Sequence, residues 1–145
     1  MPRVTVVPIK KEPRISMHSG RTKVHLLVQR QRPPGKDVGA VLDRNGRKSF
    51  VGFYHDRQVG ELITQAREKV FCSFGDKFVR IDAGNESYIL RRHDDAKTFE
   101  VHRGGLIVGR GKVAQKTSFI DTHDTKFVAI APEVLLVLIF HDLES

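Results

Sequence analysis

The stretch Gly109–Phe140, GRGKVAQKTSFIDTHDTKFVAIAPEVLLVLIF, holds the densest apolar material of the chain. It ends in VLLVLIF at 134–140, an unbroken apolar run that is too short to span a bilayer, which takes about 20 residues. Its Val, Ile and Phe content predicts a strand buried on both faces. The sequence KFVAIA at 126–131 predicts another strand. Pro132 separates the two, because proline breaks a ladder of backbone hydrogen bonds.

Length and composition predict one compact domain with room for an extension, since the chain has 145 residues of which 39% are hydrophobic. The only cysteine, Cys72, excludes an internal disulfide framework. Near the N-terminus no apolar stretch reaches the length of a signal peptide. We therefore expect a soluble intracellular protein.

The charge is the strongest global feature. Twenty-five Lys and Arg residues face seventeen Asp and Glu residues, which gives a net charge of +8. Such an excess favours a polyanionic partner, with nucleic acid first and membrane surfaces second. The sequence contains no enzyme motif, so we expect a binding protein without catalytic residues.

Residues 1–55 are predicted to form a basic extension with its own hairpin. The pieces Val38–Leu42 and Ser49–Tyr54 flank Asn45-Gly46, which is the strongest short-range signal for a hairpin turn. Upstream, KVHLLVQ at 23–29 predicts a strand, and the Pro33-Pro34-Gly35 loop follows it.

The second predicted unit, residues 56–145, begins with a helix. The sequence DRQVGELITQAREKVF at 56–71 has a capping residue in Asp56. Its apolar residues share one face at helical spacing: Val59, Leu62, Ile63, Ala66 and Val70. Alternating patterns then predict short strands at 77–81, 88–92, 98–102, 106–108 and 118–120.

Several groups of reactive residues are better explained by structure than by chemistry. His93-Asp94-Asp95 and the histidine at 123 with its neighbouring aspartates fall in predicted turns, where these residue types are ordinary. No spacing typical of metal ligands supports them, so we expect no metal and no cofactor. Cys72 is expected in the core. The glycine-rich 104–111 segment predicts a tight β-connection that is basic enough to contact phosphate.

A helix followed by about five short strands on a basic chain resembles the Sm and Sm-like proteins, in particular a D-type core Sm protein. The stretch that carries the resemblance is KVAQ at 112–115 with KTSFIDTHDTKFVAIAPEVL at 116–135. The resemblance implies a small, strongly bent antiparallel β-barrel with an N-terminal helix. The open edges of such barrels pair with neighbouring subunits to close a ring around single-stranded RNA.

Two alignments to the Sm pattern place the RNA differently. In the preferred one, two loops face the RNA, and Lys97 and Thr98 stand where the family has its base-stacking residue and its asparagine. In the other, Asn45-Gly46, Gly52 and Asp56 imitate the first motif, His102-Arg103-Gly104 imitates the Arg-Gly of the second, and Arg103 contacts the RNA. The departures of the preferred alignment from the family pattern imply diffuse basic contacts instead of base readout. The RNA-binding residues implied by the two alignments are Asp95, Lys97, Thr98, Thr122, His123, Lys126 and Arg103.

The function implied by this resemblance is that of an RNA-binding structural subunit in the Sm ring of a small nuclear ribonucleoprotein, which supports pre-mRNA splicing. The expected partners are a small nuclear RNA and other Sm-type subunits in a hetero-oligomeric ring. The expected location is the nucleus, with assembly in the cytoplasm. Neither a membrane nor a small-molecule substrate is expected.

A competing resemblance is to the tubby C-terminal and LURP-one-like barrels. There a β-rich domain closes on a very apolar C-terminal segment similar to TKFVAIAPEVLLVLIF at 125–140. In that family the segment is a helix that threads the barrel. This resemblance implies a barrel that binds phospholipid or a protein partner.

Overall fold

A computed structural model describes residues 3–7, 14–19, 22–30, 38–44, 46–54, 59–64, 66–95, 97–115 and 117–143. These residues form antiparallel strands followed by two helices. In chain order the elements are β1 Arg3–Val7, β2 Arg14–Ser19, β3 Thr22–Arg30, β4 Val38–Arg44, β5 Arg47–Tyr54, β6 Val59–Ile63, β7 Lys69–Phe74, β8 Phe78–Ala83, β9 Glu86–Arg92, β10 Thr98–Arg103, β11 Leu106–Lys112, β12 Ser118–Thr122, α1 Thr125–Val128 and α2 Ala131–Leu143.

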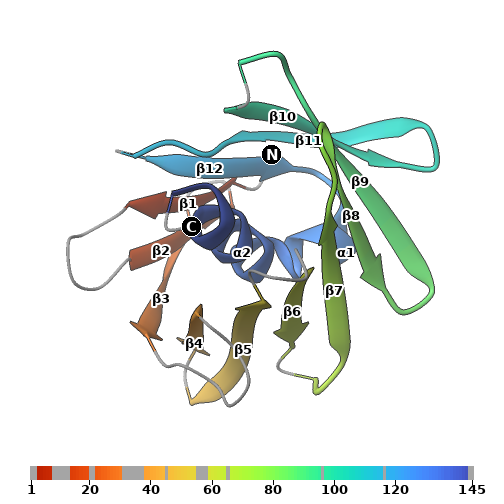
Figure 1. The fold of residues 1–145 in the computed structure, drawn as a ribbon. Coiled ribbons are helices and arrows are strands. Elements are labelled where there is room, and N and C mark those ends of the chain that lie inside the picture. The colour runs from red at the N-terminus through yellow and green to blue at the C-terminus, as the bar shows by residue number, and fades with distance from the viewer. Residues whose placement is uncertain are drawn as a thin grey trace.

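The strands form one closed barrel around α2. Each strand from β2 to β12 pairs with its sequence neighbours, and β1 pairs with both β12 and β2. Figure 1 shows α2 running through the interior, with α1 at one mouth of the barrel. Strands β1 to β5, from residues 3–54, therefore belong to the same sheet as the later strands.

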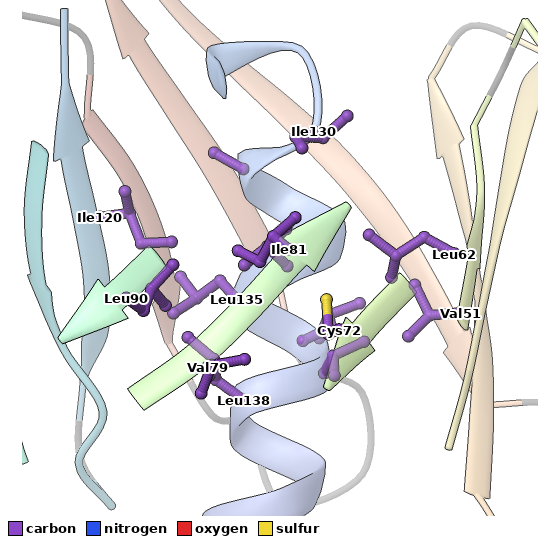
Figure 2. Close-up of a cluster of buried hydrophobic side chains, with 14 of the residues drawn as sticks. Val51, Leu62, Cys72, Val79, Ile81, Leu90, Ile120, Ile130, Leu135 and Leu138 are labelled. Atoms are coloured by element: carbon purple, nitrogen blue, oxygen red, sulfur yellow. The ribbon is translucent and has the colours of Figure 1, made fainter. Parts of the chain in front are cut away.

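The core is the contact between α2 and the inward faces of the strands. All residues of α2 from Ala131 to Phe140 are buried. A helix that is apolar all round needs burial on every side, and a closed barrel provides it. Figure 2 shows Leu135 and Leu138 among inward side chains of the strands, such as Val79, Ile81 and Leu90.

The two strands predicted at 126–131 and 134–140 are wrong, because these residues form α1 and α2. The side chain of Asp124 caps α1 by accepting a hydrogen bond from the amide of Phe127 at 3.0 Å. Pro132 lies in the first turn of α2, where its missing amide proton costs little. A helix that is buried all round has no polar face, so its sequence resembles that of a fully buried strand.

The helix predicted at 56–71 is also wrong, because the described part of this segment forms β6, a turn and the start of β7. Leu62 and Val70 point into the barrel from two paired strands. The turn between them is closed by hydrogen bonds between Thr64 and both Arg67 and Glu68, each 2.9 Å long. The apolar residues alternate along β6 and along β7, and with the turn between these strands their combined spacing matches one face of a helix. Asp56, the expected cap, lies outside the described residues.

The prediction of a mostly β chain is confirmed, but a small Sm-like barrel with an N-terminal helix is not what forms. Strands and turns predicted from local signals are present. The hairpin predicted around Asn45-Gly46 is β4–β5, although Asn45 itself lies outside the described residues. The strands expected at 23–29, 77–81, 88–92 and 98–102 correspond to β3, β8, β9 and β10. A C-terminal helix inside a barrel is the arrangement that the tubby-like resemblance implied.

Candidate functional site

The most exposed large apolar side chains of the described residues lie at the tip of the β10–β11 hairpin. Gly104 and Gly105 make the turn with φ values of 56° and 86°, a conformation that favours glycine. Leu106 and Ile107 follow directly and are 66% and 54% exposed. The hairpin extends beyond the barrel at the end where α2 begins (Figure 1).

Basic residues surround this tip. Arg103, His123 and Lys126 line a cavity of about 410 Å³ together with Leu106 and Ile107. We call these five residues the hairpin rim. The rim combines residues from β10, β11, the β12–α1 connection and α1, so the barrel closure and the start of α1 position it.

The cations of the rim are held by neighbouring carboxylates. Arg103 lies 3.1 Å from Asp124, and the Nζ atom of Lys126 donates a hydrogen bond to Glu86 at 2.7 Å. That hydrogen bond, followed by the positive charge of Lys126, lowers the pKa of Glu86. The Lys126–Glu86 pair is exposed and contributes little to stability, whereas the Asp124 carboxylate beside Arg103 is buried. Both pairs orient the cations but leave them accessible to an anionic partner.

The structure brings together three of the expected RNA-binding residues and separates the rest. Arg103, from one alignment, joins His123 and Lys126, from the other, in the hairpin rim. Lys97 and Thr98 are at the opposite end of β10 from Arg103.

The role of Asp95 is to close the β9–β10 turn. Its Oδ1 atom accepts hydrogen bonds from the amides of Lys97 at 2.9 Å and Thr98 at 3.0 Å. These bonds, with that from Thr98 first, lower the pKa of Asp95.

Thr122 is a structural residue. It is fully buried, and its hydroxyl donates a hydrogen bond to the carbonyl of Val108 at 2.8 Å. The same oxygen accepts from the amide of Asp124 at 3.1 Å, which fixes the entry to α1. A buried hydroxyl with these partners has no route to a ligand.

The aspartates considered as metal ligands have other partners. Asp121 forms an ion pair with Arg3, and Asp124 caps α1 and pairs with Arg103. Within the described ranges no three His, Cys, Asp or Glu residues are arranged to hold a metal ion. Cys72 is buried on β7, as expected for a core residue, and burial raises its pKa to about 12.

Sequence reasoning missed the role of Leu106 and Ile107. It predicted the tight β-connection at 104–111, which is the β10–β11 hairpin, but treated 106–108 as a short strand only. The available signal was two apolar residues placed directly after a Gly-Gly turn. At a hairpin tip such residues have no core beneath them.

No protein-family model, curated protein or solved structure matches this chain. The Sm-like and tubby-like resemblances therefore stay predictions. Among the helices that the structure describes, none has the length and apolar character needed to cross a membrane.

Proposed function

We propose that this protein is a non-catalytic barrel that docks on anionic phospholipid membranes through the hairpin rim. The observation that carries the proposal is the exposure of Leu106 and Ile107 at a hairpin tip that Arg103 and Lys126 flank. Apolar side chains at such a tip can enter the boundary between head groups and acyl chains. The cations beside them then lie at the depth of the lipid phosphates.

The expected energies favour this use of the rim. Burying an apolar side chain contributes about 1.5–3 kcal/mol when burial is complete. Each Lys or Arg near an anionic leaflet adds about 1 kcal/mol. The net charge of +8 would also attract the protein toward any anionic surface before contact. Phospholipid binding is in addition the function that the tubby-like resemblance implies.

The direct test is sedimentation with vesicles of phosphatidylcholine, either alone or with a fixed fraction of phosphatidylglycerol. The native chain should bind the anionic vesicles much more strongly than the neutral ones. The variant L106S/I107S should bind them about tenfold or more weakly, since two tip side chains lose apolar area. The matched control is F71S/F78S, because Phe71 and Phe78 are also exposed but lie on the outer face of β7 and β8.

Two outcomes would contradict the proposal. One is equal binding of L106S/I107S and the native chain to anionic vesicles. The other is equal binding of the native chain to neutral and anionic vesicles, which would leave the rim cations without a role.

Single-stranded RNA binding is the second candidate function, and a different surface favours it. Phe71 and Phe78 are 39% and 50% exposed on the outer face of β7 and β8. The register places Arg91 opposite Phe78, and Arg80 lies two residues further along β8 on the same face. Bases can stack on such rings for about 1–3 kcal/mol each while arginines contact phosphates.

This candidate differs from the Sm ring in its mechanism. Every described strand already has two neighbours, so the described part of the barrel offers no free edge for pairing with another subunit. If the chain binds RNA on β7–β9, F71A/F78A should weaken binding of a single-stranded oligonucleotide about tenfold or more. L106S/I107S should leave it unchanged. Unchanged RNA affinity in F71A/F78A would remove this candidate.

A further inference from the structure

A second and larger cavity adjoins the hairpin rim at the same mouth of the barrel. We call it the mouth pocket. Its volume is about 770 Å³, and Lys126 lines both it and the rim cavity. The β6–β7 turn, the β8–β9 turn and the segment that joins α1 to α2 enclose it.

The walls of the mouth pocket combine small or apolar residues with polar and charged ones. The small or apolar residues include Ala66, Val70, Ala83, Ala129 and Ile130. A volume of about 300–1,000 Å³ with apolar walls and a few polar groups is typical of sites for small ligands. The polar groups therefore decide which ligand fits.

Carboxylates outnumber cations in the mouth pocket. Its charged residues are Glu68, Glu86, Glu133, Lys69 and Lys126. Lys126 already donates to Glu86 at 2.7 Å. A purely anionic ligand would thus meet repulsion from the carboxylates, whereas a ligand with both a cation and an anion finds a partner for each.

Glu133 is the carboxylate that is most removed from water. It is 5% exposed, and its Oε1 atom accepts a hydrogen bond from the Ser49 hydroxyl at 2.9 Å. It lies in the first turn of α2, where the helix dipole favours its negative charge. A buried carboxylate on a cavity wall is a strong site for a cation, because little water competes.

Tyr88 supplies a further polar group on the same wall. It is buried, and its hydroxyl has no hydrogen-bond partner among the described residues. Burial first, and then the charge of Asp124, raise the pKa of Tyr88. The hydroxyl therefore stays protonated at neutral pH, and Asp124 competes with a ligand oxygen for its hydrogen bond.

We propose that the mouth pocket binds the phosphoethanolamine head group of a membrane phospholipid, with its ammonium at Glu133 and its phosphate at Lys69 and Lys126. This inference rests on the proposed docking function, which would present the mouth to the lipid surface. A choline head group has no N–H donor for Glu133. An inositol phosphate lacks a cation, and a serine head group brings a further carboxylate next to the glutamates.

The test compares two vesicles with the same fraction of phosphatidylglycerol, one completed with phosphatidylethanolamine and the other with phosphatidylcholine. The surface charge is equal, so a difference reports the head-group ammonium. The native chain should prefer the ethanolamine vesicles about tenfold, and E133Q should lose this preference while it keeps binding to phosphatidylglycerol. The matched control is E100Q, which removes a carboxylate from β10 outside the mouth pocket and should keep the preference.

A soluble probe removes the dependence on membrane docking and on the folding of E133Q. Glycerophosphoethanolamine added to the native chain should shift the amide resonances of Ala66, Gly84 and Ala129, which line the mouth pocket. Glycerophosphocholine should shift them less. If the ethanolamine probe shifts none of them, the proposal is overturned.

The two proposals fail in different ways. If L106S/I107S loses binding to both vesicles but the native chain shows no head-group preference, docking holds and the mouth-pocket ligand is wrong. If the native chain binds neither vesicle, docking is wrong, and the titration with glycerophosphoethanolamine still decides the ligand of the mouth pocket.

Discussion

At the scale of single residues, packing between α2 and the barrel wall leaves little free space. Gly60 on β6 faces Val137 of α2, and a Cβ atom at Gly60 would lie 2.4 Å from a methyl carbon of Val137. A valine in a helix has one strongly preferred rotamer, so it cannot turn away at low cost. Glycine is therefore required at position 60 for space and not for backbone conformation.

We expect Gly60→Ala to lower the free energy of unfolding by about 1–3 kcal/mol, as overpacking in cores does. Urea denaturation of the native chain and the variant measures the change. The double variant G60A/V137A should recover part of the loss, because it removes the methyl groups that clash. If the two substitutions have simply additive costs, the two side chains do not compete for this space.

A partly buried ion pair joins the end of β9 to the last turn of α2. Arg92 donates two hydrogen bonds to Asp142 at 2.7 and 2.9 Å, and His141 lies 2.7 Å from the same carboxylate. Burial alone would raise the pKa of Asp142, but the hydrogen bonds from His141 and Arg92 outweigh it and lower the pKa. A carboxylate with a lowered pKa in the folded state stabilises the fold above its unfolded pKa, and this contribution is lost as the pH falls through the folded value.

The stability lost on acidification should therefore depend on Asp142 below about pH 4, where an unfolded aspartate takes up its proton. Asp142→Asn should cost about 1–3 kcal/mol at neutral pH and flatten the fall in melting temperature from pH 5 to lower pH. Asp76→Asn, in the exposed β7–β8 turn, is the control. It should change neither the stability at neutral pH nor the fall in melting temperature on acidification. An equal acid response in the native chain and Asp142→Asn would refute this role.

At the scale of elements, burial and not hydrophobicity separates the apolar residues of α2 from those of the hairpin rim. Leu135 is fully buried in the barrel, whereas Leu106 is mostly exposed at the hairpin tip. Leu135→Ala should cost about 2–5 kcal/mol of unfolding free energy, and Leu106→Ala less than about 0.5 kcal/mol. Thermal unfolding of both variants measures the difference. Similar melting temperatures would show that the tip residues pack onto the fold and are not free to enter a membrane.

Elements that depend on local signals could be predicted, and those that depend on tertiary surroundings could not. The β4–β5 hairpin follows from Asn45-Gly46, and β8 to β10 follow from alternation between turns. The strand predicted at 134–140 is a helix instead, because burial on every side removes the polar face that identifies a helix in a sequence. The helix predicted at 56–71 is wrong for the opposite reason. The apolar residues of two strands and the turn between them have a spacing that matches one face of a helix.

Three of the five residues of the hairpin rim were predicted from the sequence as RNA contacts, whereas Leu106 and Ile107 were not predicted. Arg103, His123 and Lys126 were chosen from two alignments that excluded each other, and barrel closure places them in one rim. Their proximity depends on β12 returning beside β11 and on α1 starting directly after it. The sequence around Arg103 contains no local signal that would place it beside His123 and Lys126.

At the scale of the whole molecule, the net charge of +8 and the apolar tip should contribute to membrane binding in different ways. Salt screens charges, because the Debye length falls from about 10 Å at 0.1 M to about 3 Å at 1 M. Vesicle binding of the native chain should therefore fall strongly with salt but keep a residual part that L106S/I107S lacks. Sedimentation at both salt concentrations measures it, and binding that salt does not change would rule out a role for the charge.

The pairing of β1 with β12 has a consequence for how the protein is made. Arg3 and Asp121, which face each other in that pairing, are at nearly opposite ends of the chain. Synthesis proceeds from the N-terminus, so β1 to β11 leave the ribosome before the strand that closes the sheet and before the helix that fills it. Until α2 emerges, the inward faces of the strands have no core to cover. The barrel should thus fold only after α2 has left the ribosome, and its nascent form should depend on chaperones that shield apolar strand faces.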